Sequence, residues 1–77
     1  MPKQKPVSGN KLIKALSSVG FRVVGTKGSH VRLKKKGETG IFIVIVPLHQ
    51  EMKRGTLKSI LRQAGLTAED LKALLEN

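Results

Sequence analysis

Cysteine is missing from this sequence of 77 residues, and histidine and acidic residues are scarce. The lack of cysteine excludes disulfide bonds, thiolate zinc sites and cysteine nucleophiles. Two histidines cannot build a three-histidine metal site, and five scattered acidic residues do not favour a two-metal carboxylate cluster. A chain of this length also has no room for a cofactor-binding domain beside a substrate domain. We therefore expect neither a metal ion nor a cofactor.

Aromatic side chains are nearly absent as well. There is no tryptophan or tyrosine, and Phe21 and Phe42 are the two phenylalanines, so base stacking on an aromatic platform is not favoured. Fifteen Lys and Arg residues against five Asp and Glu give a net charge of +10. Residues 1–38 hold ten of the cations and one acidic residue, Glu38, whereas residues 39–77 hold five cations and four acids. The basic half indicates a nucleic acid, contacted through its phosphates, or an acidic protein as the partner. The alternative is a generally basic, soluble protein.

Long hydrophobic stretches are also lacking. The longest apolar run, residues 41–46, stops at Pro47 and is far too short to span a membrane. The basic residues that follow Met1 are not succeeded by an apolar segment, so no signal peptide is expected. These features predict a cytoplasmic protein without a membrane partner.

The first half of the chain reads as a short arm, a helix and the start of a sheet. Residues 1–7, with two prolines and two lysines, predict a flexible basic arm, and residues 8–77 a single domain. A helix is expected over residues 9–19, capped by Ser8 and ended by Gly20. Three strands separated by Gly-containing turns are then expected over residues 21–25, 30–34 and 41–46.

Two further helices complete the predicted fold. Thr56 is expected to cap the first, which Gly65 ends, and Thr67 with Asp70 forms a capping box for the second. The inward residues of that last helix are expected to be Leu71, Leu74 and Leu75. The order α-β-β-β-α-α predicts an α+β fold of two layers, with a three-stranded antiparallel sheet and helices on one face. The double-stranded-RNA-binding arrangement is one fold of this kind.

The third strand, residues 41–46, is β-branched and apolar without any alternation. Such a run predicts burial on both faces. In a three-stranded meander it is also an edge, so it indicates a homodimer or a dedicated protein partner. Alternatively, the helices and the N-terminal arm cover it within the chain.

His30 is the first candidate for chemistry. It begins an alternating strand that turns Val31 and Leu33 to the core and His30, Arg32 and Lys34 to the other face. Residues on one face of a strand are about 6.6–6.8 Å apart, so the three polar groups line a cationic track. Nearby cations favour the neutral imidazole, which can act as a general base in RNA cleavage without a metal ion. The simpler alternative is a polar residue on a solvated strand.

Two other residues are weaker candidates. His49, in the loop after Pro47, is either a second acid for the leaving oxygen or a residue that shapes the loop. Ser29 is adjacent to His30, and neighbours in an extended chain point to opposite faces, so a hydroxyl–imidazole pair would need a twisted turn.

Cations form two groups along the sequence. Those near the second strand, with Gly28 in the adjoining turn, predict the main RNA contact, whereas those near residue 55 predict a second anchor at a helix start. A solvated helix face, or charges that shield the third strand, would explain the same pattern. The predicted RNA-binding residues are Lys27, Gly28, Arg32, Lys34, Lys35, Lys53, Arg54 and Thr56.

Several motifs together resemble those of the HicA-type mRNA interferase toxins, over roughly residues 8–75. They are Ser8-Gly9, Val19-Gly20-Phe21, Lys27-Gly28-Ser29-His30, Val46-Pro47-Leu48-His49 and the Gly-Thr-Leu…Gln-Ala-Gly-Leu segment, residues 55–66. The resemblance implies a double-stranded-RNA-binding-like fold and the toxin of a type II toxin–antitoxin system that cleaves mRNA. It also implies a HicB-type antitoxin that blocks the active site, and it places the family's catalytic histidine at His30. The third strand is longer and more apolar than is usual in that family.

Three functions follow from these observations. The leading one is a metal-independent endoribonuclease with His30 as the catalytic acid or base. The alternative is a non-catalytic RNA-binding module of the same fold, in which His30 contacts a phosphate or a 2′-hydroxyl. A third is a small basic protein that binds an acidic protein partner.

Overall fold

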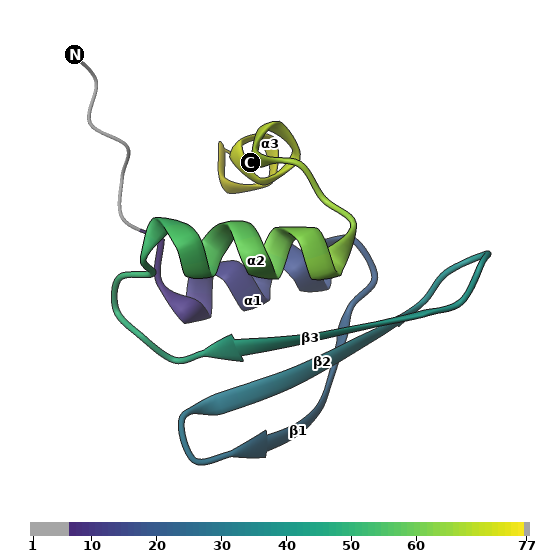
Figure 1. Cartoon of the computed structure of the whole chain (residues 1–77), viewed down its shortest axis with the longest axis horizontal. Helices are drawn as coiled ribbons and strands as arrows, with labels where there is room; N and C mark the ends of the chain where they lie inside the picture. Colours follow the sequence, from purple (N-terminus) through teal and green to yellow (C-terminus); the bar gives the residue numbers. More distant parts are fainter. Residues whose placement is uncertain (1–6, 77) are drawn as a thin grey trace.

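The computed structural model describes residues 7–76, which form three helices and three strands (Figure 1). The predicted arm, residues 1–7, lies outside the described residues except for Val7. The elements follow the predicted order and are α1 (Gly9–Ser18), β1 (Arg22–Lys27), β2 (His30–Lys36), β3 (Ile41–Pro47), α2 (Arg54–Ala64) and α3 (Ala68–Glu76). Within residues 7–76, no helix combines the length and the apolar character that a membrane crossing requires.

Helix α1 begins and ends within one residue of its predicted limits. The Ser8 side chain accepts a hydrogen bond from the Lys11 backbone N–H at 3.1 Å, which satisfies a free donor of the first turn. At the other end Gly20 has a φ of +104°, and the Phe21 N–H donates to the Leu16 carbonyl at 3.1 Å. This closure leads the chain out of the helix and places Phe21 in the core.

The strands form an antiparallel sheet in the order β1-β2-β3, so β1 and β3 are its edges. Strand β1 ends at Lys27 instead of Gly25, and β2 ends at Lys36 instead of Lys34. Backbone pairing explains the extra length, because the ladder between β1 and β2 continues up to the pair Lys27 and His30. Such hydrogen bonds do not depend on side-chain polarity, so strands run past the residues that carry the hydrophobic pattern.

The core lies between the sheet and the helices, which are all on one side of the sheet (Figure 1). Helices α1 and α2 both pack against β3, whereas β1 lies furthest from the helices and is exposed along its whole length. We call the sheet face turned away from the helices the open face. The fully buried side chains are Leu12, Leu16, Leu33, Val44 and Val46.

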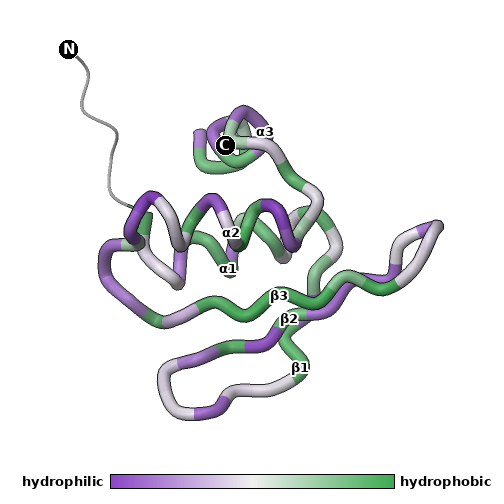
Figure 2. Tube along the Cα trace, viewed as in Figure 1, coloured by the Kyte–Doolittle hydropathy of each residue, from purple (hydrophilic) through white to green (hydrophobic). Residues whose placement is uncertain are grey.

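The expectation that residues 41–46 are buried on both faces is wrong. Val44 and Val46 are fully buried, but Ile41, Ile43 and Ile45 on the open face are 57%, 53% and 45% exposed. The reason is that the domain has one helix layer, which covers one face of an apolar strand. Figure 2 shows β3 as a continuous apolar segment. Cover by the N-terminal arm falls outside the described residues.

The prediction that Thr56 caps α2 is also wrong, because the helix starts three residues earlier than that cap implies. Its N-cap is Lys53, whose side chain makes no capping hydrogen bond. A tertiary contact holds the chain just before this point, since buried Met52 donates its N–H to the Val7 carbonyl at 2.8 Å. The loop is therefore placed by packing, and the helix begins without the side-chain cap that sequence patterns favour.

Helix α3 begins at the predicted capping box. The Thr67 N–H donates to Asp70 Oδ2 at 2.9 Å, and the Asp70 N–H donates to Thr67 Oγ1 at 3.0 Å. Leu71 is buried and Leu74 packs against the core, but Leu75 is 38% exposed, so its predicted inward position is wrong. Leu74 and Leu75 lie on opposite sides of Leu71 around the helix axis, and the side of Leu74 is the one that faces the core.

The capping box gives a testable dependence of stability on pH. Hydrogen bonds from the Thr67 backbone N–H and then from its hydroxyl lower the pKa of Asp70. A lowered pKa means that ionised Asp70 favours the folded chain at neutral pH, and that this contribution is lost as the pH falls through the folded-state pKa. We expect Asp70→Asn to lower the free energy of unfolding at pH 7, with a difference that shrinks in acid. Urea unfolding of both proteins, from pH 7 down through the pKa of Asp70, measures this difference. A difference that stays constant with pH would contradict the prediction.

Candidate active site

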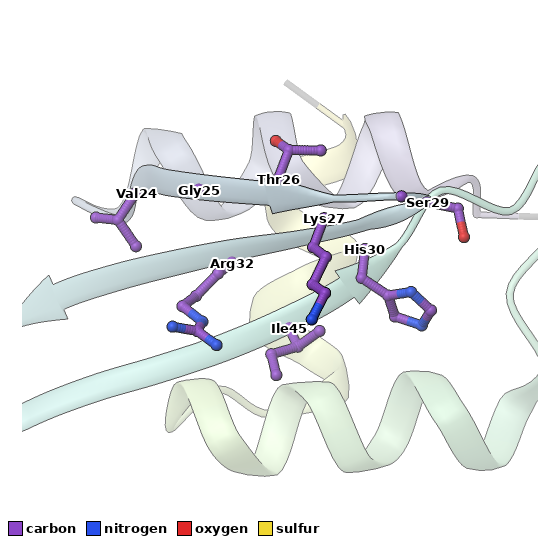
Figure 3. A pocket seen from close by; sticks show the side chains of 9 residues that line it. Val24, Gly25, Thr26, Lys27, Ser29, His30, Arg32 and Ile45 are labelled. Atoms are coloured by element: carbon purple, nitrogen blue, oxygen red, sulfur yellow. The ribbon is translucent and has the colours of Figure 1, made fainter.

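An open pocket lies around the turn between β1 and β2 (Figure 3). Most of its lining comes from these two strands and their turn, and one side chain comes from β3. The residues that line it are Val24, Gly25, Thr26, Lys27, Gly28, Ser29, His30, Arg32 and Ile45. Five of the predicted site residues are thus brought together, namely Lys27, Gly28, Ser29, His30 and Arg32.

His30 is the first residue of β2 and is exposed, as the alternating pattern predicted. Val31 and Leu33 are buried toward the helices, which directs the imidazole to the open face. Across the sheet, His30 pairs with Lys27 of β1 and with Pro47 of β3. In Figure 3 the side chains of His30 and Lys27 project to the same side. A phosphate bound between them would meet an imidazole and an ammonium together.

The turn before His30 is held in place by its backbone. Gly28 has a φ of +60° while Ser29 keeps a negative φ, a combination that matches the type II′ turn favoured in two-residue hairpins. The Ser29 carbonyl accepts a hydrogen bond from the Leu48 N–H at 2.7 Å, which ties the turn to the end of β3. Within residues 7–76, the Ser29 hydroxyl makes no hydrogen bond to the His30 ring. The structure thus gives Ser29 a backbone role.

A β-bulge in β1 shapes the pocket next to Arg32. The register between β1 and β2 shifts at Val24, so that Gly25 pairs with Arg32. No atom lies within 4 Å of the position where a Gly25 side chain would begin, which leaves room beside the guanidinium. The other four lining residues, Val24, Gly25, Thr26 and Ile45, were not among the predicted site residues. An isolated glycine within a strand is a signal for such a bulge and would have indicated the first two.

The open face carries a row of cations along β2, formed by Arg32, Lys34 and Lys36, which we call the cation row. All three are exposed. Lys34 pairs with Arg22 of β1, and like charges placed opposite each other destabilise a sheet. No Asp or Glu occurs on any of the three strands to relieve this repulsion. A bound anion would relieve it.

Lys35 differs from its neighbours on β2. It pairs with Phe42, and its ammonium lies 5.7 Å from the centre of the Phe21 ring. This distance fits a cation–π contact, which stabilises the domain by about 0.5–1 kcal/mol at a partly exposed site. Lys35 therefore belongs to the helix side of the sheet and does not line the pocket.

The remaining predicted residues lie outside the pocket. The His49 carbonyl accepts a hydrogen bond from the Gly9 N–H at 2.8 Å. Through this backbone contact His49 joins the loop after β3 to α1. Lys53, Arg54 and Thr56 are exposed around the first turn of α2, where no acidic residue occurs. In Figure 1 this helix start lies at the same end of the molecule as the turn between β1 and β2, but in the helix layer.

Among the described residues, no acidic side chain lines the pocket. Glu38 lies in the turn after β2, and the other four follow β3 in the chain. Within the described part of the chain, no three His, Asp or Glu side chains are grouped so that they could hold a metal ion. The charge of the pocket is therefore set by Lys27 and Arg32, and it suits a phosphate.

The sequence matches a family of known proteins. A family model described as the HicA toxin of bacterial toxin–antitoxin systems matches residues 9–66, from the start of α1 to just beyond α2. The match includes all three strands and every residue of the pocket. No curated protein matches the chain. Because the family match covers well over half of its residues, the chain belongs to the HicA toxin family of bacterial toxin–antitoxin systems.

Proposed function

We propose that this toxin is an mRNA interferase in which His30 catalyses RNA cleavage by acid–base chemistry without a metal ion. HicA toxins are known mRNA interferases, and the family implies RNA and a HicB antitoxin as partners. The observation that supports the proposal is the exposed His30 in an open pocket that also holds Lys27 and Arg32. An imidazole beside two cations supplies both a proton acceptor and charge for a phosphodiester.

The reaction that suits these groups is an intramolecular transesterification of the RNA. The 2′-hydroxyl oxygen attacks the adjacent phosphorus while the His30 imidazole accepts the hydroxyl proton. Lys27 and Arg32 stabilise the negative charge that grows on the phosphate oxygens. The 5′-oxygen leaves with a proton from water, which the open pocket admits. The products are a 2′,3′-cyclic phosphate and a 5′-hydroxyl end.

The same proposal assigns the RNA-binding residues. Lys27, Gly28 and Arg32 contact the cleaved phosphate, because they line the pocket with His30. Lys34 continues the cation row along the open face. The exposed first turn of α2, with Lys53, Arg54 and Thr56, offers free N–H groups and cations to a second phosphate at the same end of the molecule. Lys35 is left out because its ammonium lies over Phe21.

A substrate that lacks the attacking hydroxyl tests this chemistry directly. We expect the purified toxin to cleave an mRNA in EDTA and to leave 2′,3′-cyclic phosphates, and to leave uncut a copy with 2′-deoxyribose at the cleavage position. Chromatography with mass spectrometry identifies the ends. Cleavage of the deoxy copy, or a requirement for Mg²⁺, would contradict the proposal. Tight binding without cleavage of either RNA would favour the non-catalytic RNA-binding module.

A further inference from the structure

We propose that the free edge of β3 receives an extended segment of an acidic partner protein, which adds a fourth strand to the sheet. In this segment acidic and aliphatic residues alternate. The inference rests on the proposed function in taking the antitoxin as the source of the segment. The site adjoins the pocket without coinciding with it, since Ile45 of β3 lines the pocket whereas Ile41 and Ile43 do not.

The first observation is that β3 is an unpaired edge. It pairs with β2 on one side, and no backbone hydrogen bond joins Ile41–Val46 to any other segment of residues 7–76. Its ladder with β2 runs without a register shift over seven consecutive pairs. A long regular edge of this kind presents a row of free N–H and C=O groups that readily accept another strand.

The second observation is that this edge lacks the usual protection. Natural edge strands carry charges, prolines or bulges that prevent pairing with other chains. The opposite edge, β1, has a bulge at Val24 and charged residues at both ends, Arg22 and Lys27. Strand β3 has no charged residue, and its one proline is the last residue, Pro47. Protection of β3 is therefore expected to come from a bound chain.

The third observation is charge, which decides what kind of chain binds. The exposed isoleucines Ile41 and Ile43 pair with Lys36 and Lys34 of the cation row. An added strand would lie about 4.8 Å beyond β3, so glutamate stems on the open face would cover the isoleucines while their carboxylates reach these lysines. Aliphatic residues at the alternate positions would face the helix side of the sheet.

The same charge argument disfavours the predicted homodimer through β3. A second copy brings another net charge of +10 and strands without acidic residues. Residues 1–6 of the chain carry Lys3, Lys5 and no acidic side chain, so they do not offer carboxylates either. An acidic partner is the occupant that satisfies both the apolar edge and the cation row.

A synthetic peptide of Val-Glu repeats, about ten residues long, serves as the probe. We expect it to shift the NMR signals of the β3 amides, Ile41–Val46, and to slow their hydrogen exchange. The double variant Ile41→Thr/Ile43→Thr keeps β-branched residues and should weaken binding by about tenfold or more, since apolar contact is lost. Leu75→Thr, which changes an exposed leucine on α3, is the matched control and should bind normally.

Further variants keep the outcome clear if the double variant folds poorly. Lys36→Glu should weaken binding through repulsion, and a Val-Lys peptide should not bind. Equal binding by all variants, signal shifts confined to β1 or α2, or a β3-dependent dimer of the free protein would overturn the proposal. So would protection of the β3 amides by RNA in place of the peptide. Failure of the proposed function is scored separately, because His30→Ala should still bind the peptide and Ile41→Thr/Ile43→Thr should still cleave RNA.

Discussion

Replacing His30 with alanine is expected to lower the rate of RNA cleavage by about 10²–10⁴-fold, the range that a positioned acid or base contributes. Affinity for RNA should change by less than about threefold, because phosphate contacts to lysine and arginine supply most of it. The fold should survive, since His30 is exposed and its side chain makes no hydrogen bond within residues 7–76. Single-turnover cleavage of an mRNA in EDTA, beside equilibrium binding of the same RNA, separates the two effects.

His49→Ala is the matched control for this experiment. The structure uses the backbone carbonyl of His49, which accepts from the Gly9 N–H, and the substitution keeps that carbonyl. Its cleavage rate should stay within about threefold of the parent, because its side chain takes no part in the proposed proton transfer. Equal cleavage by the parent and His30→Ala would exclude His30 as the catalyst. A large loss in His49→Ala alone would move the acid–base role to the loop after β3.

The position of His30 was predictable because it depends on local alternation. Val31 and Leu33 are apolar, their neighbours are polar, and a strand of this pattern has one orientation relative to a core. The Ser8 cap and the Thr67–Asp70 capping box were predictable for the same reason, since each joins residues within one turn. Contacts between residues that are close together in the chain can therefore be predicted from the sequence alone.

The predictions that were wrong concern features that depend on distant parts of the chain. An apolar run in the sequence does not state whether a second layer exists, and the open face of β3 shows that none does within residues 7–76. The start of α2 depends on the backbone hydrogen bond from Met52 to Val7. The pocket combines the bulge at Val24 with Ile45 from β3, and such proximity follows from strand register, which composition and spacing leave open.

Gly9→Ala is expected to destabilise the toxin strongly. Gly9 is buried at the start of α1, and an added methyl group would overlap the Pro47 carbonyl oxygen and lie 3.0 Å from Leu48 Cα. Both neighbours are backbone atoms, so no side chain can rotate away. Forcing a methyl group into such a site costs about 1–3 kcal/mol, and each kcal/mol lowers the Tm of a domain of this size by about 4–8 °C. Thermal unfolding followed by circular dichroism measures the change.

Gly55→Ala supplies the matched control, because the same chemical change should have the opposite sign. Gly55 is exposed in the first turn of α2 and has no atom within 4 Å of an added methyl group. Alanine there should stabilise the protein by about 0.5–1 kcal/mol through its better helix propensity. Similar stability of both variants would show that α1 does not need the close contact. If Gly9→Ala does lower the Tm, its effect should extend to cleavage, since Pro47 pairs directly with His30.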